Sequence, residues 1–351
     1  MAMPLLSPTS PSDRLSPGTR TLPLLSTQHP DPDLREYNRR ALEALPWPVA
    51  AVLFSELDPA SAWTLGWASR DYFPQLRIAW SLRNLLLRFV TDVPRFRSRL
   101  RDAGGVIAGG LPTQFFARET WPDSDMDIFF VDYHSPEWPP EGHYDPSDAL
   151  SLLISFLMEK EGYVLAPGGG AISGDRILLD GSTDHCPGYD FVLLNLRRST
   201  QVVQIVIHRW SGDPVFDGNP LLSSLLEKFY GTHVMNFITS DTAVSVFPRI
   251  TFVRREMVVV RRGDEGLLEL RNSTPASVEK YKRRGWASGS FRGEELTGVR
   301  SVGDDKCWVI GFDGEGFPLR PARRVPDSIR FEVGPDGLVR LRSEDSESLS
   351  S

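Results

Sequence analysis

The chain reads Gly109-Gly110 and then, after a short segment of helical pattern, Ser124-Asp125-Met126-Asp127-Ile128-Phe129-Phe130. Alternate residues of a strand project to the same face, so Asp125 and Asp127 should point the same way. Neighbouring carboxylates repel each other unless a cation lies between them, and grouped oxygen ligands suit Mg²⁺. Glycines let a turn approach a phosphate closely. The stretch therefore predicts a site for a metal ion and a nucleotide.

The alternative interpretation is a surface strand with two solvated aspartates. The apolar run Ile128-Phe129-Phe130-Val131 argues against it, because such a run is typical of a buried strand.

Strands and helices are predicted on both sides of this stretch. Apolar patterning predicts strands over 105–108, 126–131, 189–196 and 201–208, the last two joined as a hairpin by residues 197–200. It predicts helices over 111–116 and 146–161, another that opens at Asn219-Pro220, and a short one near 275–284. Together these elements predict a mixed α/β protein of the α+β class, with a central sheet flanked by helices.

The N-terminal part of the chain is helical in pattern. Residues 34–80 predict short helices, with Asp58-Pro59 ending one and starting the next. Residues 81–101 predict one basic amphipathic helix that Pro94 kinks or breaks. We interpret its arginines as a charged outer face, with phosphate contact as the alternative.

Composition limits the possible functions. The chain has 351 residues, a net charge of -7 and two cysteines, Cys186 and Cys307. Acidic bulk charge makes nucleic-acid binding unlikely, and so few cysteines make a disulfide framework unlikely. No apolar run reaches the ~18 residues of a membrane span. We expect no membrane partner and a cytoplasmic or nuclear, reducing environment.

The unit from Gly109-Gly110 to Asp125-Met126-Asp127 resembles the nucleotidyltransferase fold of the DNA polymerase β superfamily. Further segments resemble a set of largely uncharacterised fungal proteins that join an F-box-like segment to a nucleotidyltransferase-like domain. The segments are Gln114-Phe115-Phe116, Trp121-Pro122-Asp123-Ser124-Asp125, Val203-Gln204-Ile205-Val206, Thr232-His233-Val234-Met235-Asn236, Phe247-Pro248-Arg249 and Lys280-Tyr281-Lys282-Arg283-Arg284-Gly285-Trp286.

The resemblance implies roles for particular residues. Asp125 and Asp127 would be catalytic and would hold Mg²⁺ or Mn²⁺, while Gly109 and Gly110 would face a nucleoside triphosphate. The third carboxylate of the superfamily should fall where this chain has Gln204, which is neutral and cannot act as a general base. Asp190 on the partner strand is the other candidate for that position.

Residues 45–73 resemble a degenerate F-box, a small helical module that docks on a Skp1-type adaptor of a ubiquitin ligase. The resemblance rests on Leu45-Pro46, Val52-Leu53-Phe54, Leu57-Asp58-Pro59 and Ser69-Arg70 before Tyr72-Phe73. The alternative is that these helices pack only on the domain that follows.

Five segments are predicted along the chain. They are a disordered leader over 1–33, the F-box-like segment over 34–80, the nucleotidyltransferase-like domain over 81–240, a small α+β extension over 241–330 and a partly disordered acidic tail over 331–351.

Two functional hypotheses follow. The first is a nucleotidyltransferase-like protein that binds a Mg-nucleotide and is either an enzyme or a catalytically degenerate relative. The second is an F-box-type interaction protein that uses the α/β domain as a scaffold for a ubiquitin-ligase substrate. Two further features are interpreted as structural. Lys280–Arg284 is a solvated helix face, with phosphate or nucleic-acid contact as the alternative, and His233 is a core or helix-end histidine and not a ligand.

Overall fold

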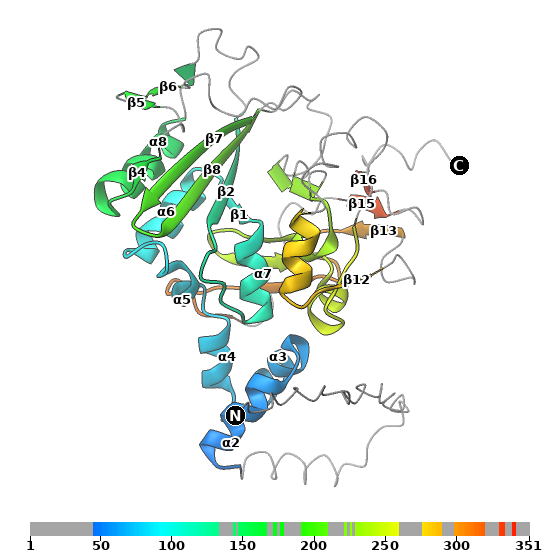
Figure 1. Cartoon of the computed structure of the whole chain (residues 1–351). Helices are drawn as coiled ribbons and strands as arrows, with labels where there is room; N and C mark the ends of the chain where they lie inside the picture. The colour runs from blue at the N-terminus through cyan, green and yellow to red at the C-terminus, as the bar shows by residue number, and fades with distance from the viewer. Residues whose placement is uncertain are drawn as a thin grey trace, which may run out of the picture. The chain divides into compact units, whose positions relative to one another are not determined.

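The strands predicted around the paired aspartates lie at the centre of an eight-stranded sheet (Figure 1). All neighbouring strands are antiparallel except β2 and β8, which are parallel. The order across the sheet is β14 (Trp308–Gly311), β10 (Thr242–Ser245), β9 (Asn236–Ile238), β1 (Val106–Ala108), β2 (Met126–Asp132), β8 (Gln201–Arg209), β7 (Phe191–Arg198) and β4 (Val164–Leu165). With its helices this sheet makes a mixed α+β protein, as predicted.

The computed structural model describes residues 45–132, 143–144, 147–166, 171–173, 176–178, 191–209, 221–222, 225–226, 229–259, 276–289, 298–319, 330–333 and 339–341. The predicted leader, the start of the predicted helical segment and most of the predicted tail lie outside these residues. The boundary predicted after residue 240 falls between β9 and β10, which are hydrogen-bonded neighbours.

The unit β1–α7–β2 forms where the sequence predicts a strand, a helix and a strand. All three residues of β1 are buried. Helix α7 (Gly110–Ala117) follows directly and packs against β1, β2 and β9. Arg118 then ends the helix in the left-handed conformation, with φ 58°. The short helix therefore holds the glycine turn at one end and the loop before β2 at the other.

The predicted hairpin is also present. Strands β7 and β8 pair from Phe191 opposite His208 to Arg198 opposite Gln201, so only Ser199 and Thr200 form the turn. Ser199 adopts a left-handed conformation, with φ 54°. The hairpin places β8 parallel to β2, with Gln204 opposite Asp127.

The helix predicted over 81–101, with a kink or break at Pro94, is broken into two helices: α5 (Leu82–Leu86) and α6 (Val93–Asp102). Pro94 lies in the first turn of α6, where a missing N–H costs nothing. The interruption precedes it, and there the backbone N–H of Asp92 donates to Glu161 Oε1 at 3.0 Å.

The predicted helix over 146–161 is present as α8 (Asp148–Ser155) and the π-helical turn η1 (Phe156–Lys160). Leu150, Leu153 and Ile154 form the buried face of α8.

From residue 45 onward, where the structure describes the chain, three helices precede α5, in agreement with the short helices predicted there. They are α2 (Trp47–Glu56), α3 (Pro59–Ala68) and α4 (Phe73–Ala79). Asp58 caps α3 by accepting hydrogen bonds from the backbone N–H groups of Ala60 and Ser61 at 3.0 and 3.1 Å.

The remaining elements are short. They are the turns η2 (Thr232–Val234) and η3 (Arg249–Val253), the parallel pair β11 (Glu256–Met257) and β12 (Ala287–Ser288), the sheet β13 (Gly298–Ser301), β15 (Arg330–Val333) and β16 (Val339–Leu341), and the sheet β3 (His143–Tyr144), β6 (Arg176–Leu178) and β5 (Ala171–Ser173). A helix also spans residues 276–283, as predicted.

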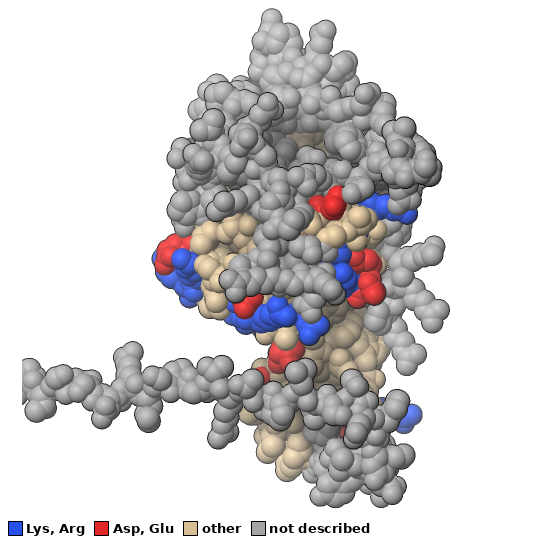
Figure 2. All heavy atoms as spheres, turned by 90° about the vertical axis from the view of Figure 1, so that its right-hand side faces the viewer, with Lys and Arg blue, Asp and Glu red and all other residues tan. Residues whose placement is uncertain are grey.

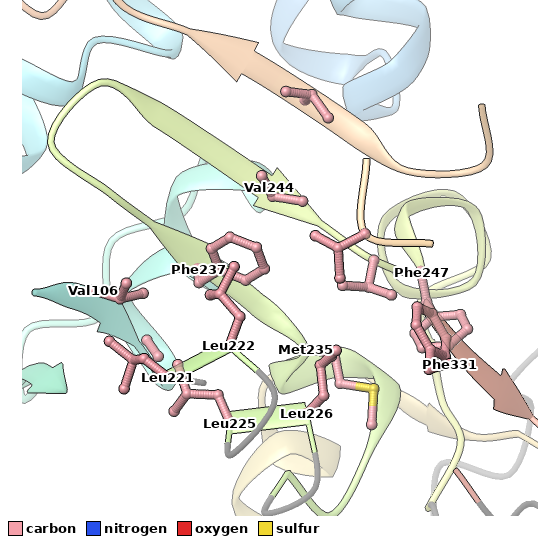
Figure 3. Packing of buried hydrophobic residues seen from close by; sticks show 14 of the residues in the cluster. Val106, Leu221, Leu222, Leu225, Leu226, Met235, Phe237, Val244, Phe247 and Phe331 are labelled. Carbon is pink, nitrogen blue, oxygen red and sulfur yellow. The ribbon is translucent and has the colours of Figure 1, made fainter. Parts of the chain in front are cut away.

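A buried core fixes one face of the sheet. Val106, Phe237 and Val244 on β1, β9 and β10 pack with Phe331 and with the leucines at positions 221, 222, 225 and 226 (Figure 3). Residues 221–222 and 225–226 are helical, in agreement with the helix predicted after Asn219-Pro220.

Candidate functional site

Gly109 joins β1 to α7 in a conformation that favours glycine, with φ 75° and ψ -134°. A Cβ atom at this position would lie 2.5 Å from Oδ2 of Asp127, far inside contact distance. The carboxylate of Asp127 therefore lies directly against the turn. The structure thus brings together the glycine pair and the acidic strand that the sequence places in one site.

Asp127 occupies a central register position. It lies opposite Ala108 of β1 on one side and Gln204 of β8 on the other. Asp125 immediately precedes β2, and its charge acts on Asp127. Both predicted metal ligands therefore belong to one local group.

Electrostatics distinguish Asp127 from an ordinary surface acid. The pKa of Asp127 is raised to about 7, chiefly by burial and in addition by the charge of Asp125, while the charge of Lys280 lowers it. Its Oδ1 atom is buried and has no hydrogen-bond partner among the described residues. An unsatisfied buried carboxylate oxygen is costly, and a bound cation would relieve that cost.

Gln204 holds the position beside Asp127 where the resemblance places a third carboxylate. Its Nε2 donates to Oδ1 of Asn195 at 2.9 Å, and Asn195 is its partner across β7 and β8. Both side chains are neutral, so this row of the sheet adds no acid to Asp127. Asp190, the other candidate, lies outside the described residues.

The helix over 276–283 lies beside α7 (Figure 1). The hydroxyl of Tyr281 lies 3.6 Å from where a Cβ of Gly110 would be, and it hydrogen-bonds the side chain of Thr113. Tyr281 is buried, whereas its neighbour Lys280 is exposed and acts electrostatically on Asp127. The sequence favours a solvated face for Lys280. Its nearness in sequence to Tyr281 and Trp286 is the only sequence signal that this residue could lie near the site.

Aromatic side chains hold this helix in place. The ring of Tyr281 lies 4.3 Å from that of His233 and 5.8 Å from that of Trp121, measured between centroids. Trp286 packs on both Trp121 and Tyr281. Arg284 covers the ring of Trp121, with Cζ 3.8 Å from its centroid.

His233 belongs to the core, as the sequence suggested. It is fully buried, and burial lowers its pKa to about 3, so it is neutral at ordinary pH. Its Nε2 lies 3.3 Å from the hydroxyl of Tyr230. Its backbone oxygen accepts hydrogen bonds from Thr113 Oγ1 at 2.9 Å and Asn236 Nδ2 at 2.8 Å. It therefore ties η2 to α7 and has no role as a base.

A polar clamp positions the loop before β2. Oε1 of Gln114, on α7, accepts hydrogen bonds from Trp121 N at 2.8 Å and Arg88 Nη1 at 3.0 Å, and its Nε2 donates to Ser124 Oγ. Arg88 also donates to the backbone oxygen of Trp121 at 3.1 Å. Arg88 therefore orders the loop that leads into Asp125 and is not a free phosphate ligand.

The described residues fit a divalent cation only in part. Asp125 and Asp127 supply carboxylate oxygens, and Mg²⁺ commonly takes one or two carboxylates with water and phosphate oxygens as its other ligands. Within the described ranges, no group of three or more His, Cys, Asp or Glu side chains is placed to hold a metal. A cation here would depend on a bound phosphate for much of its coordination.

A cavity elsewhere in the fold does not coincide with this chemistry. It has a volume of about 610 Å³, lies between α3 and η3, and is lined mainly by apolar residues such as Trp63, Phe247 and Trp308. Neither the paired aspartates nor the paired glycines line it. The candidate site is therefore defined by its carboxylates and its turn and not by a cavity.

Comparisons with protein-family models, with curated proteins and with solved structures each found no match to the chain. Among the helices that the structure describes, none combines the length and apolar character needed to cross a membrane.

Proposed function

We propose that this chain binds a nucleoside triphosphate together with Mg²⁺ or Mn²⁺, on a nucleotidyltransferase-like domain. One observation carries the proposal: the carboxylate of Asp127 lies against the Gly109 turn, next to Asp125, with a buried oxygen that has no partner among the described residues. The N–H groups of Gly110 and Leu111 at the start of α7 have no acceptor within the helix and suit phosphate oxygens, whereas Pro112 has no N–H to offer. Asp125 and Asp127 would hold the cation, which neutralises the phosphates when bound.

Binding is better supported than catalysis. Transfer of a nucleotidyl group needs a base for the attacking hydroxyl, and the neutral Gln204 beside Asp127 cannot serve. The predicted replacement, Asp190, is not among the described residues. We therefore propose a nucleotide-binding protein with weak or no transferase activity.

Thermal unfolding of the full chain tests this proposal. Mg²⁺ or Mn²⁺ with ATP, GTP, CTP or UTP at about 100-fold its dissociation constant should add ~2.7 kcal/mol to the free energy of unfolding. The double variant Asp125→Asn/Asp127→Asn should lose the shift. Asp123→Asn, at an exposed position in the same loop, should keep it. No shift in the wild type with any of the four nucleotides would refute the proposal.

A second candidate is an F-box-type adaptor that docks a Skp1-type protein through residues 45–73. It is favoured by exposed apolar side chains: Val49 and Val52, about one turn apart on α2, form an apolar face that is 50% and 61% exposed, and Ile78 on α4 is 66% exposed. The larger apolar residues Phe54, Trp63 and Trp80 are buried, so the helices pack internally and still present a face.

Capture of a purified Skp1-type adaptor by the full chain tests this second function. Val52→Asp should abolish capture, because it places a charge in the exposed apolar face. Val299→Asp is a matched control, since Val299 on β13 is similarly exposed at 58% and lies on another element. Failure of the wild type to capture the adaptor would rule out this function in its simple form.

A further inference from the structure

The number of acidic side chains around Asp127 sets how much positive charge the site takes. Asp125 and Asp127 are its two carboxylates, and the next register position on β8 holds Gln204. The structure describes no third acidic, His or Cys side chain that joins them. Two divalent cations side by side repel strongly, and in two-metal sites the surrounding acids offset this repulsion. Two acids are few for that purpose.

The side chain of Gln204 already has a hydrogen-bond partner. Its amide nitrogen donates to Asn195 at 2.9 Å, which fixes the orientation of the amide along the row of strands. The amide oxygen that remains is neutral. It lacks the charge that favours a second cation at this position.

Lys280 adds a positive charge that acts on Asp127. Tyr281, the next residue along the helix, fixes this helix to α7. Its side chain contacts Thr113 and His233, and its hydroxyl lies 3.6 Å from where a Cβ of Gly110 would be. Lys280 itself is exposed, and its ammonium acts on the carboxylate of Asp127. A flexible, solvated ammonium beside a carboxylate pair is suited to contact a phosphate.

Lys282, two residues further on, is different. It pairs with Glu279 at 3.9 Å on the exposed side of the same helix. Figure 2 shows both cationic and anionic side chains on the described part of the face that it views. The position of Lys280 therefore matters more than the overall charge of the segment.

We propose that the site holds one divalent cation, and that Lys280 supplies the positive charge that a second cation would otherwise bring to the triphosphate. This inference rests on the proposed nucleotide binding. It assigns Lys280 as a phosphate-binding residue, and it explains how a site with two carboxylates among the described residues can hold a triphosphate.

Counting bound Mn²⁺ by electron paramagnetic resonance tests the first half. The full chain is saturated with a non-hydrolysable ATP analogue and titrated with Mn²⁺. We expect one Mn²⁺ per protein–nucleotide complex in the wild type. Gln204→Asp should allow a second Mn²⁺ to bind, because it adds a carboxylate at this position. Gln204→Glu is the alternative if the first variant folds poorly. Two Mn²⁺ ions in the wild type would overturn the inference.

Calorimetric titration with the same analogue tests the second half. Lys280→Ala should weaken binding by roughly tenfold or more, and Lys280→Arg should recover most of it. Lys282→Ala should bind like the wild type, because Lys282 points to Glu279. Equal effects of Lys280→Ala and Lys282→Ala would overturn the role of Lys280. A wild type that binds no nucleotide would instead refute the underlying proposed function, so the two failures are distinct.

Discussion

Gly109 shows how a single residue shapes the candidate site. Gly109→Ala should cost about 1–3 kcal/mol for its backbone conformation alone, and its Cβ would also push against Asp127 Oδ2. We expect a lower free energy of unfolding in urea and loss of the melting shift with Mn²⁺ and ATP, because the carboxylate is displaced.

Gly104→Ala is the matched control for this change. Gly104 also has a positive φ, of 64°, but no atom lies within 4 Å of where its Cβ would be. It should lose about 1–2 kcal/mol of stability and keep the nucleotide-induced shift. If both variants keep the shift, Asp127 does not depend on the turn.

Asp127 should reduce the stability of the free protein at high pH. Burial raises its folded-state pKa to about 7, above the value of ~4 in an unfolded chain, so ionisation favours unfolding. The wild-type free energy of unfolding should therefore fall as pH rises from about 4 to about 7 and then level off. In metal-free buffer, Asp127→Asn should be the more stable protein above pH 7, with the gain vanishing near pH 4.

Urea unfolding at several pH values measures this difference. Asp123→Asn changes an exposed acid of the same loop and should show no such pH-dependent gain. A gain for Asp127→Asn that is the same at pH 4 and pH 8 would show that it does not come from ionisation.

Among the elements, the break between α5 and α6 depends on Glu161. Burial alone would raise the pKa of Glu161, but hydrogen bonds from the backbone of Asp92 and Thr91 and from the side chains of Thr91 and Arg198 outweigh it and lower the pKa. A lowered carboxylate pKa contributes stability above the unfolded value of ~4.3 and loses it as pH falls. Glu161 thus joins η1 to the start of α6 and to β7.

Glu161→Gln should cost about 2–3 kcal/mol at neutral pH, because charge-assisted hydrogen bonds are lost and their donors remain partly buried. The loss should shrink toward pH 3, where the wild-type carboxylate also becomes protonated. Glu159→Gln, at an exposed position of the same turn, should have little effect. A constant loss across this pH range would mean that packing and not charge is responsible.

Sequence patterns predict the elements whose cause is local. The strand–helix–strand unit around Gly109 and the β7–β8 hairpin follow from apolar alternation and turn residues, and both are present. Pro94 is a local signal for the break before α6, but it does not show where α5 ends, because apolar spacing continues through the break. The partner that stabilises it, Glu161, is distant in the sequence, and a local pattern cannot contain such a contact.

Across the whole chain, the same limit applies to the candidate site. Asp125, Asp127, Gly109 and Gly110 follow one another closely, so their grouping is visible in the sequence. The charge of Lys280 acts on Asp127 because the next residue, Tyr281, packs on Thr113 and His233, which lie on separate elements. That arrangement depends on tertiary packing, and residue type alone pointed only to a basic helix face.

The N-terminal helices and the sheet should unfold together, because tryptophans join them. Trp63 of α3 and Trp80 after α4 contact Trp308 of β14, with ring centroids 5.7 and 5.6 Å apart, and Arg118 at the end of α7 donates to the backbone oxygens of Phe54 and Leu57. Trp308→Ala should cost about 3–5 kcal/mol and separate unfolding of α2–α4 from that of the sheet.

Hydrogen exchange measured by mass spectrometry resolves this separation, because peptides from α3 and from β8 report on the two parts independently. In the wild type both should open with the same free energy, and in Trp308→Ala the α3 peptides should open first. Trp67→Ala is the matched control, since Trp67 contacts Trp63 and Phe73 within the N-terminal helices and does not touch the sheet in these ring contacts.

If α3 already opens independently in the wild type, the helices are an autonomous module. A partner bound to their exposed face would then leave the Gly109 turn unaffected, whereas joint opening would couple such a partner to the nucleotide site through α7.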